Sequence, residues 1–262
     1  MRRVRDVAGQ VVVVTGAARG LGALVATRLA ARGARVALLG LEPGELAGVS
    51  ARCGPHSRWW EVDVTDERAL ADIAAAVRDA YDRVDVVVAN AGIANIGPWP
   101  DEPFDQWREI LDVNLSGTML TCKAAWPHLV ASTGNIVVVS SLSAWMGVGQ
   151  HELDQMGGFQ PCPSYQASKA GIEGLAKHLA GRGGEHGLRV NVVRPGRILT
   201  DKWEDVLGSD GLFWSHYEKV QLLKRHGRTQ DVAAAVAFLA SDEAAFITAA
   251  VLDVDGGAVV KL

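Results

Sequence analysis

Four consecutive valines run directly into a glycine-rich turn near the start of the chain, and this pairing restricts the fold more than any other feature. Val11–Val14 carries no polar residue, which is typical of a strand buried on both faces in a parallel sheet. The turn, Thr15–Gly22, contains three glycines, and it is followed by a helical pattern to about Arg32 and a second strand pattern over Arg35–Leu39. Strand, glycine turn, helix and strand in this order predict the βαβ unit that begins a dinucleotide-binding fold.

The alternation of strand and helix continues to the end of the chain. Further strands are expected at Trp60–Val64, Val84–Ala89, Asn135–Ser140, Arg189–Val193 and Val251–Val254, and helices at Glu67–Tyr81, Phe104–Val130, Ser164–Gly181 and Thr229–Ala240. We therefore predict an α/β protein with a three-layer, doubly wound Rossmann fold, in which helices flank a mostly parallel seven-stranded sheet. No linker or repeat divides the sequence, so residues 1–262 are expected to form one domain.

The composition narrows the class of partner. The 262 residues are 48% hydrophobic and 21% charged, as in a globular protein with a large core, and the net charge of −4 argues against nucleic acid as a partner. The apolar runs are too short for a signal peptide or a membrane span. Cys53, Cys122 and Cys162 are widely separated and fit reduced thiols in a cytoplasmic protein. Seven histidines without metal-ligand spacing predict no metal site.

One Tyr–Lys pair carries most of the chemical signal. Tyr165 and Lys169 are four residues apart in a helical pattern, so their side chains stand on one helix face. An ammonium beside a phenol favours the phenolate, which would lower the pKa of the phenol and let it donate and accept a proton near neutral pH. Alone, such a pair also fits a surface tyrosine beside a solvated lysine. The glycine turn, Asn90-Ala91-Gly92 after one strand and Ser140-Ser141 after another favour the catalytic interpretation.

Together and in this order, these motifs resemble those of the single-domain branch of the short-chain dehydrogenase/reductase family, over almost the whole chain. The resemblance implies four catalytic residues: Asn114, Ser141, Tyr165 and Lys169. In this family the tyrosine donates a proton to the developing alkoxide, the serine hydrogen-bonds the carbonyl oxygen, and the lysine lowers the tyrosine pKa and contacts the cofactor ribose. The asparagine kinks its helix and holds a water that contacts the lysine. Ser140 and Ser143 are the alternatives to Ser141.

The resemblance also assigns a binding site for a nicotinamide cofactor. The implied contacts are Gly16, Ala18, Arg19, Gly20, Leu21, Gly22, Asp63, Val64, Asn90, Ala91, Gly92, Tyr165, Lys169, Pro195, Gly196, Ile198 and Thr200. Folds that select NAD(H) place an acid at the end of the second strand, but in the family's register that position is Gly40, and Glu42 lies two residues further on. Arg19 stands where NADP(H) users often carry a base, so NADP(H) is favoured over NAD(H), although NAD-using relatives carry this arginine too.

The chain departs from the family between the catalytic serine and tyrosine. Ser141 precedes Tyr165 by 24 residues, about twice the separation usual in this branch. The extra segment, near 147–163, has no clear helical or strand period, so we expect an active-site insertion there. A substrate flap is expected near 200–226. The candidate substrate contacts are Trp145, Phe159, Trp203 and Trp214.

The implied reaction is hydride transfer between nicotinamide and a carbonyl or alcohol, as in a ketoreductase or secondary-alcohol dehydrogenase. The tryptophans favour a bulky apolar or aromatic small molecule as substrate. The alternatives are an epimerase or dehydratase that uses the cofactor transiently, which the wide Ser–Tyr separation permits, an NAD-dependent alcohol dehydrogenase, and a non-catalytic dinucleotide-binding protein. Small residues on the Tyr165 helix (Ala167, Ala170, Gly171 and Gly174) allow close helix packing, so we expect a homo-oligomer, either a tetramer or a dimer.

Overall fold

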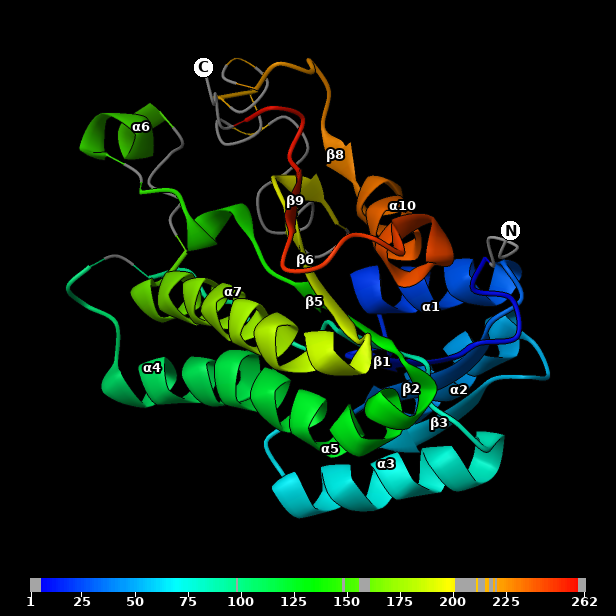
Figure 1. Ribbon diagram of the computed structural model, residues 1–262. Coiled ribbons are helices and arrows are strands. Elements are labelled where there is room, and N and C mark those ends of the chain that lie inside the picture. The colour runs from blue at the N-terminus through cyan, green and yellow to red at the C-terminus, as the bar shows by residue number, and fades with distance from the viewer. Residues whose placement is uncertain are drawn as a thin grey trace.

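Seven parallel strands form the central sheet of the computed structural model, which describes residues 6–97, 99–147, 149–155, 161–200, 211, 215, 216, 219 and 221–258 (Figure 1). The strands are β1 (Val11–Thr15), β2 (Arg35–Gly40), β3 (Arg58–Glu61), β4 (Val86–Ala89), β5 (Asn135–Val139), β6 (Arg189–Pro195) and β9 (Val251–Val254). Their spatial order is β3-β2-β1-β4-β5-β6-β9, and every neighbouring pair is parallel. The predicted seven-stranded, doubly wound fold is confirmed.

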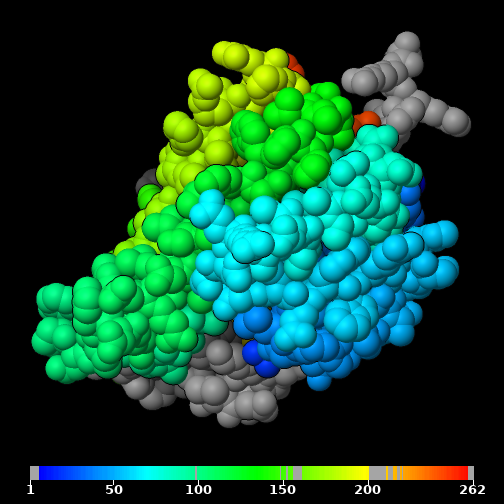
Figure 2. Space-filling model, turned by 90° about the horizontal axis from the view of Figure 1, so that it is seen from below, coloured from blue at the N-terminus to red at the C-terminus, as the bar shows by residue number. Residues whose placement is uncertain are grey.

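Helices cover both faces of this sheet. One layer contains α1 (Gly20–Ala31), α2 (Pro43–Cys53) and α10 (Thr229–Ala240), and the other contains α3 (Glu67–Tyr81), α5 (Gly117–Ser132) and α7 (Pro163–Gly183). Figure 2 shows part of the second layer from outside, with α3 in cyan and α5 in green. The valine run of β1 serves both layers, because Val12 and Val14 pack into the first core and Val11 and Val13 into the second.

Shorter elements join the main helices and strands. α4 (Phe104–Leu111) continues into α5 through a π-helical turn, Asp112–Ser116. A 3₁₀ turn, Leu142–Ala144, follows β5, and α6 (Gln150–Gln155) lies beyond the sheet, away from both helical layers (Figure 1). Two further 3₁₀ turns are Gly184–His186 and Asp242–Ala244, and β7 (Ile198–Leu199) pairs with β8 (Gly227–Arg228) in a separate two-stranded ladder.

Several elements differ from the sequence-based prediction: α2 was not expected, and the helix expected at Phe104–Val130 is divided by the π-helical turn. The third strand ends at Glu61 rather than Val64, because the Asp63 carboxylate turns the chain by accepting hydrogen bonds from the Thr65 amide and hydroxyl, both at 2.8 Å. The insertion near 147–163 contains a helix, α6, although no helical period was expected there. Within α6, Gln150 Nε2 donates to Asp154 Oδ1 one turn later at 2.9 Å, a local contact that stabilises a short helix.

The strand order reverses between β1 and β4, and this reversal sets the place of a ligand. From β1 the chain proceeds outward to β2 and β3, whereas from β4 it proceeds the other way to β5 and β6. In doubly wound sheets the two sets of connections separate at this point and leave a crevice outside the carboxyl ends of the strands. The glycine turn, Asn90, Ser141 and Gly196 all follow strand ends at this edge.

Candidate active site

The glycine turn between β1 and α1 is shaped so that a backbone, not side chains, faces the crevice. Gly16 and Gly20 have φ of +63° and +55°, a backbone region that residues other than glycine rarely adopt. A Cβ on Gly22 would lie 2.1 Å from the carbonyl oxygen of Gly16, so only glycine fits there. A Cβ on Gly20 would meet nothing within 4 Å, which leaves that side of the turn open.

The helix that follows offers its first amide groups to the same opening. Arg19 occupies the N-cap position of α1 in an extended conformation, and its side chain accepts no capping hydrogen bond. The positive end of the helix dipole and these amides favour an anion such as a pyrophosphate. The turn and the helix start therefore fit the dinucleotide that the sequence predicts.

The turns after β1 and β4 are bonded to each other. Thr15 Oγ1 accepts from the amides of Asn90 and Ala91, both at 3.1 Å, and Asn90 Nδ2 donates to the carbonyl of Thr15 at 3.0 Å. The predicted segment Asn90-Ala91-Gly92 thus holds the glycine turn in place as well as lining the edge. Asp63 and Val64, the other predicted contacts here, follow β3, with Val64 buried and Asp63 exposed.

Asn114 lies in the π-helical turn and clamps two parts of the site together. Its amide group bonds the backbone of Ile93 in both directions, at 2.8 and 2.9 Å, and donates to Ser168 Oγ at 3.0 Å. Gly92 fits between this side chain and Lys169, because a Cβ there would lie 3.1 Å from Asn114 Oδ1 and 3.6 Å from Lys169 Nζ. The sequence predicted a kinked helix at Asn114, and the chain makes a π turn there.

Tyr165 and Ser141 meet at the centre of the site. The Ser141 hydroxyl is hydrogen-bonded to the phenol of Tyr165, and Ser141 Oγ also accepts from the Ser143 amide at 3.2 Å. Burial raises the pKa of the Tyr165 phenol above its usual value, while the Ser141 hydrogen bond and the positive charge of Arg197 act to lower it. The phenol is therefore protonated at neutral pH and holds a proton that it can donate.

Lys169 is in place beside Tyr165. Its Nζ lies 5.7 Å from the centre of the Tyr165 ring and donates to the carbonyl oxygen of Val139 at 3.0 Å. Burial lowers the pKa of this ammonium to about 8, because the side chain is only 5% exposed. That Lys169 in turn lowers the pKa of Tyr165 stays a prediction, and the positive charge of Arg197 also acts to lower it.

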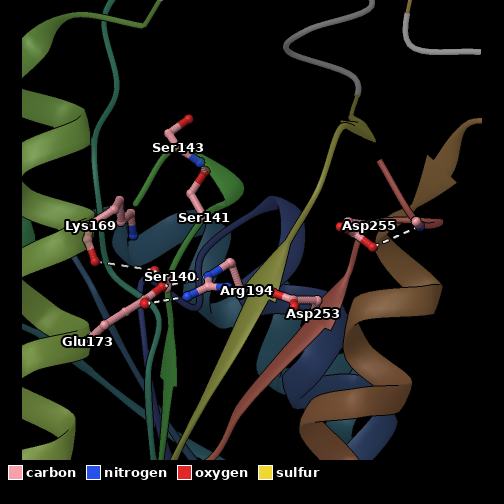
Figure 3. A network of polar contacts seen from close by, with 9 residues as sticks. Ser140, Ser141, Ser143, Lys169, Glu173, Arg194, Asp253 and Asp255 are labelled. Atoms are coloured by element: carbon pink, nitrogen blue, oxygen red, sulfur yellow. Dashed lines mark hydrogen bonds and ion pairs between the residues drawn. The ribbon is translucent and has the colours of Figure 1, made fainter. Parts of the chain in front are cut away.

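The three neighbouring serines point in different directions (Figure 3). Ser140 Oγ turns away from Tyr165 and donates to Glu173 Oε1 at 2.7 Å, with a longer contact of 3.3 Å to the carbonyl of Lys169. Ser143 contributes its amide to Ser141 rather than a hydroxyl to Tyr165. Among these serines, Ser141 is the one whose hydroxyl reaches the phenol, which supports its choice over the two alternatives.

The motif after β6 lies against the end of β9. A Cβ on Gly196 would lie 2.5 Å from the Cα of Asp255, and the Gly196 amide donates to the Val254 carbonyl at 2.9 Å. Pro195 is buried, whereas Ile198 and Thr200 are partly exposed beyond it, at the start of the predicted flap. Most of that flap, including Trp203 and Trp214, lies outside the described residues, as does Phe159 of the insertion.

Three large apolar side chains are exposed on the loops that follow β4 and β5, and we call these loops the rim of the site. Trp145, a predicted substrate contact, is 57% exposed just after the Ser141 turn. Ile96 and Trp99, in the loop after β4, are also exposed, and Ile96 pairs with Pro161 at the end of the insertion. The insertion therefore returns to the chain next to the loop after Gly92, close to the start of α7.

Three polar residues near the site escaped the sequence analysis. Arg197 lies inside Pro195–Thr200, the segment with implied cofactor contacts, so the sequence already placed a positive charge near the site. Glu102 accepts from the amide of Ser164 at 3.1 Å, and from its hydroxyl, at the start of α7. The helix was expected to begin at Ser164, and it begins one residue earlier, at Pro163, with Cys162 at the N-cap position. Glu173 carried no sequence signal, because its partners come from distant strands.

Metal ligation has no obvious place in this arrangement. Within the described ranges, no three His, Cys, Asp or Glu side chains gather as metal ligands would. The three cysteines are free thiols, two of them buried.

Comparisons with known proteins agree with this geometry. A family model described as Enoyl-(Acyl carrier protein) reductase matches residues 16–259. The chain is 35% identical to D-threitol dehydrogenase of Mycolicibacterium smegmatis, over 97% of this chain and 94% of that one. It is 36% identical to cis-4-hydroxycyclohexanecarboxylate dehydrogenase of Sinomonas cyclohexanicum, over 95% and 96%. A solved short-chain type dehydrogenase/reductase from Mycobacterium ulcerans superimposes with a TM-score of 0.88 at 31% identity, covering 97% of this chain and 91% of that one.

Proposed function

Because the chain belongs to the short-chain dehydrogenase/reductase family and is an NAD(P)-dependent oxidoreductase acting on CH–OH groups, we propose that it is an NADP(H)-dependent ketoreductase or secondary-alcohol dehydrogenase. Its substrate would be a bulky apolar or aromatic small molecule. The observation that carries this proposal is the hydrogen bond between Ser141 and the half-buried Tyr165, one helical turn from Lys169.

The residues of the chain supply position and a proton. The bound nicotinamide cofactor supplies or accepts the hydride. Ser141 would hydrogen-bond the substrate oxygen and hold it beside Tyr165, and Tyr165 would donate its proton to that oxygen as negative charge develops. In the oxidative direction Tyr165 takes the proton back. Lys169 would anchor the cofactor ribose, and the Asn114 clamp would keep Lys169 and Gly92 at their present separation.

The pH dependence of this step should reveal the Arg197 charge. Alcohol oxidation needs the ionised phenol, so kcat/KM rises with pH through the pKa of Tyr165. Arg197→Leu removes a positive charge that lowers this pKa, so the rising limb should move to higher pH. Arg68→Leu, at an exposed position on α3, is the matched control and should leave the limb in place. A limb that stays where it was, or moves to lower pH, would show that Arg197 does not act on the phenol.

The proposed preference for NADP(H) concerns the end of β2. Arg19 is 81% exposed there and forms an ion pair with Glu42 at 3.1 Å. Gly40 leaves no acid at the strand end itself, and guanidinium suits a phosphate. Glu42, however, brings a carboxylate within reach of the same place, so it competes with a phosphate for Arg19.

Arg19→Ala should therefore weaken NADPH binding more than NADH binding. We expect a difference of about fivefold, or ~1 kcal/mol, because the contact is exposed and screened by solvent. Glu42→Gln should act in the opposite direction and favour NADPH, since it removes the competing charge. Dissociation constants from nicotinamide fluorescence would measure both. Equal losses for the two cofactors in Arg19→Ala would remove the main support for NADP(H).

The proposed substrate class is testable with a panel of ketones and alcohols and both cofactors, followed at 340 nm. The exposed rim residues Trp145, Ile96 and Trp99 favour bulky apolar compounds, and cyclic secondary alcohols are included because one relative is named for a hydroxycyclohexane acid. Stoichiometric conversion of the cofactor would support an oxidoreductase. Product formation without net cofactor conversion would instead indicate the epimerase or dehydratase alternative.

We also infer a cytoplasmic homo-oligomer that assembles through α4, α5 and α7. Phe104 and Met119 are exposed on α4 and α5, and Ala170 and Gly174 are exposed on α7. Small residues of this kind let two helices approach closely. Gly171 does not belong to this surface, because a Cβ there would lie 3.1 Å from the Leu115 side chain of the same chain. Among the described helices, none is both long and apolar enough to cross a membrane.

A further inference from the structure

A chain of buried polar groups runs beneath the site from β5 through α7 and β6 to β9 (Figure 3). Ser140 Oγ donates to Glu173 Oε1 at 2.7 Å. Arg194 donates to Glu173 twice, from Nε to Oε1 at 2.9 Å and from Nη2 to Oε2 at 2.6 Å. The other side of the guanidinium donates from Nη1 to Asp253 Oδ1 at 2.8 Å. These contacts link four elements that are far apart in sequence.

Ser140, Glu173 and Arg194 are each adjacent in sequence to a part of the proposed active site. Ser140 directly precedes Ser141. Glu173 follows Lys169 by one helical turn, and Ser140 also contacts the Lys169 carbonyl at 3.3 Å. Arg194 directly precedes Pro195 and Gly196, two of the cofactor contacts that the family resemblance implies. Asp253, in contrast, only flanks Arg194 from the outermost strand of the sheet.

The network is expensive to bury, which indicates a role in geometry. The side chains of Glu173 and Arg194 are only 10% and 11% exposed. Taking two charges out of water offsets most of their attraction, so such a pair adds little net stability, but it enforces one geometry because any displacement leaves a buried charge unpaired. Apolar side chains could hold α7 on the sheet equally well. They would fix neither the direction of the Ser140 side chain nor the position of β6, which carries Arg194, relative to α7.

We propose that Glu173 and Arg194 are positioning residues: through Ser140 they hold Ser141 against Tyr165, and through Arg194 they hold the Pro195–Gly196 segment beside both. This inference rests on the proposed role of the Ser141–Tyr165 pair. The contacts that Glu173 and Arg194 make are with each other, with Ser140 and with Asp253. They act by keeping β5, α7 and β6 in register, and a small misplacement of reacting groups costs much of the rate.

The sign of one measurement separates positioning from a direct effect of charge. If Glu173 acted on Tyr165 through its negative charge, its removal would lower the pKa of the phenol. If Glu173 acts by holding Ser141 in place, its removal weakens the Ser141 hydrogen bond, which now lowers that pKa, and the pKa of the phenol rises. A purely structural role would leave the pKa unchanged in the folded protein.

The test compares Glu173→Gln with Asp253→Asn. Both changes remove one carboxylate charge from Arg194. Glu173→Gln replaces one of two acceptor oxygens with an amide donor that faces the guanidinium or Ser140, whereas Asp253→Asn keeps an oxygen that can accept the 2.8 Å hydrogen bond from Arg194 Nη1. The titration of Tyr165 is followed by the ¹³C resonance of its ring carbon Cζ in tyrosine-labelled protein, assigned with Tyr165→Phe. This measurement needs no substrate.

We expect Glu173→Gln to move the titration midpoint of Tyr165 to higher pH and Asp253→Asn to leave it in place. With any substrate found in the panel, Glu173→Gln should lower kcat by about tenfold and change the KM for the cofactor less than about twofold, as loss of alignment predicts. Ser140→Ala, which keeps the Glu173–Arg194 pair and removes its bond to β5, should move the midpoint the same way. It keeps the test valid if Glu173→Gln does not fold.

A midpoint that is unchanged or falls in Glu173→Gln, or in Ser140→Ala where the first variant does not fold, overturns the proposal. So does an equal shift in Asp253→Asn, because that would reflect the lost charge rather than the lost alignment. If the wild-type protein turns over no compound in the panel, the proposed function fails, and the titration midpoints still decide whether these residues position Ser141.

Discussion

Tyr165→Phe is expected to lower kcat by about 100-fold or more, the range for loss of a general acid. The change removes only the hydroxyl, which is the group that is hydrogen-bonded to Ser141 and that we propose as the proton donor. The aromatic ring and the neighbouring Lys169, 5.7 Å from the ring centre, remain. Cofactor binding should therefore persist, with a dissociation constant within about twofold of wild type. Initial rates on a panel substrate and a fluorescence titration with the reduced cofactor measure the two quantities.

Tyr81→Phe is the matched control, because Tyr81 is buried and its hydroxyl is also hydrogen-bonded. Tyr81 Oη donates to the carbonyls of Val36 and His56 at 3.1 and 3.2 Å, near the amino end of β2 and away from the crevice at the carboxyl ends of the strands. Its loss should cost stability of about 1 kcal/mol and leave the rate unchanged. If Tyr165→Phe retained near-wild-type rates with the native substrate, Tyr165 would not be the acid.

The sheet could be predicted because its signal is local and repeated. Each buried strand is a continuous apolar run, and the parallel order then brings the carboxyl ends of β1, β4, β5 and β6 to one edge. The apolar strand before the glycine turn was enough to place that turn at this edge. The four-residue spacing of Tyr165 and Lys169 was enough to place them on one helix face. Boundaries were less predictable, as at the third strand, where the Asp63 side chain competes with the strand for backbone hydrogen bonds.

Side-chain direction and long-range charge could not be predicted from the sequence. Ser140, Ser141 and Ser143 have similar local surroundings, and the strand end and the 3₁₀ turn after it decide which hydroxyl reaches Tyr165. Glu173 and Arg194 are 21 residues apart and on different elements, so no pattern indicates their ion pair. The pKa of Tyr165 depends on burial and on the charge of Arg197, and burial is a property of the assembled fold.

The glycine turn should be equally intolerant of a small change, and Gly22→Ala is the sharpest test of it. The added Cβ would lie 2.1 Å from the Gly16 carbonyl oxygen, 2.6 Å from Asn90 Nδ2 and 2.9 Å from the Gly16 carbonyl carbon. Two of these neighbours are backbone atoms, so the turn itself must move. Gly16 cannot retreat, because a Cβ at its own position would already lie 2.8 Å from the Cα of Ala91.

We expect Gly22→Ala to destabilise the protein by ~1–3 kcal/mol, as overpacking does, and to weaken cofactor binding by about 100-fold. That loss corresponds to two displaced charge-assisted hydrogen bonds of about 1.5 kcal/mol each at the start of α1. Gly44→Ala is the control: it makes the same substitution in α2, where a Cβ meets nothing within 4 Å, and it should be neutral or stabilising. Thermal unfolding and a titration with the reduced cofactor report the two effects separately. A variant that binds the cofactor as tightly as wild type would mean that the turn can rearrange without losing its anion site, and the tight packing of Gly22 against Gly16 would then have no part in binding.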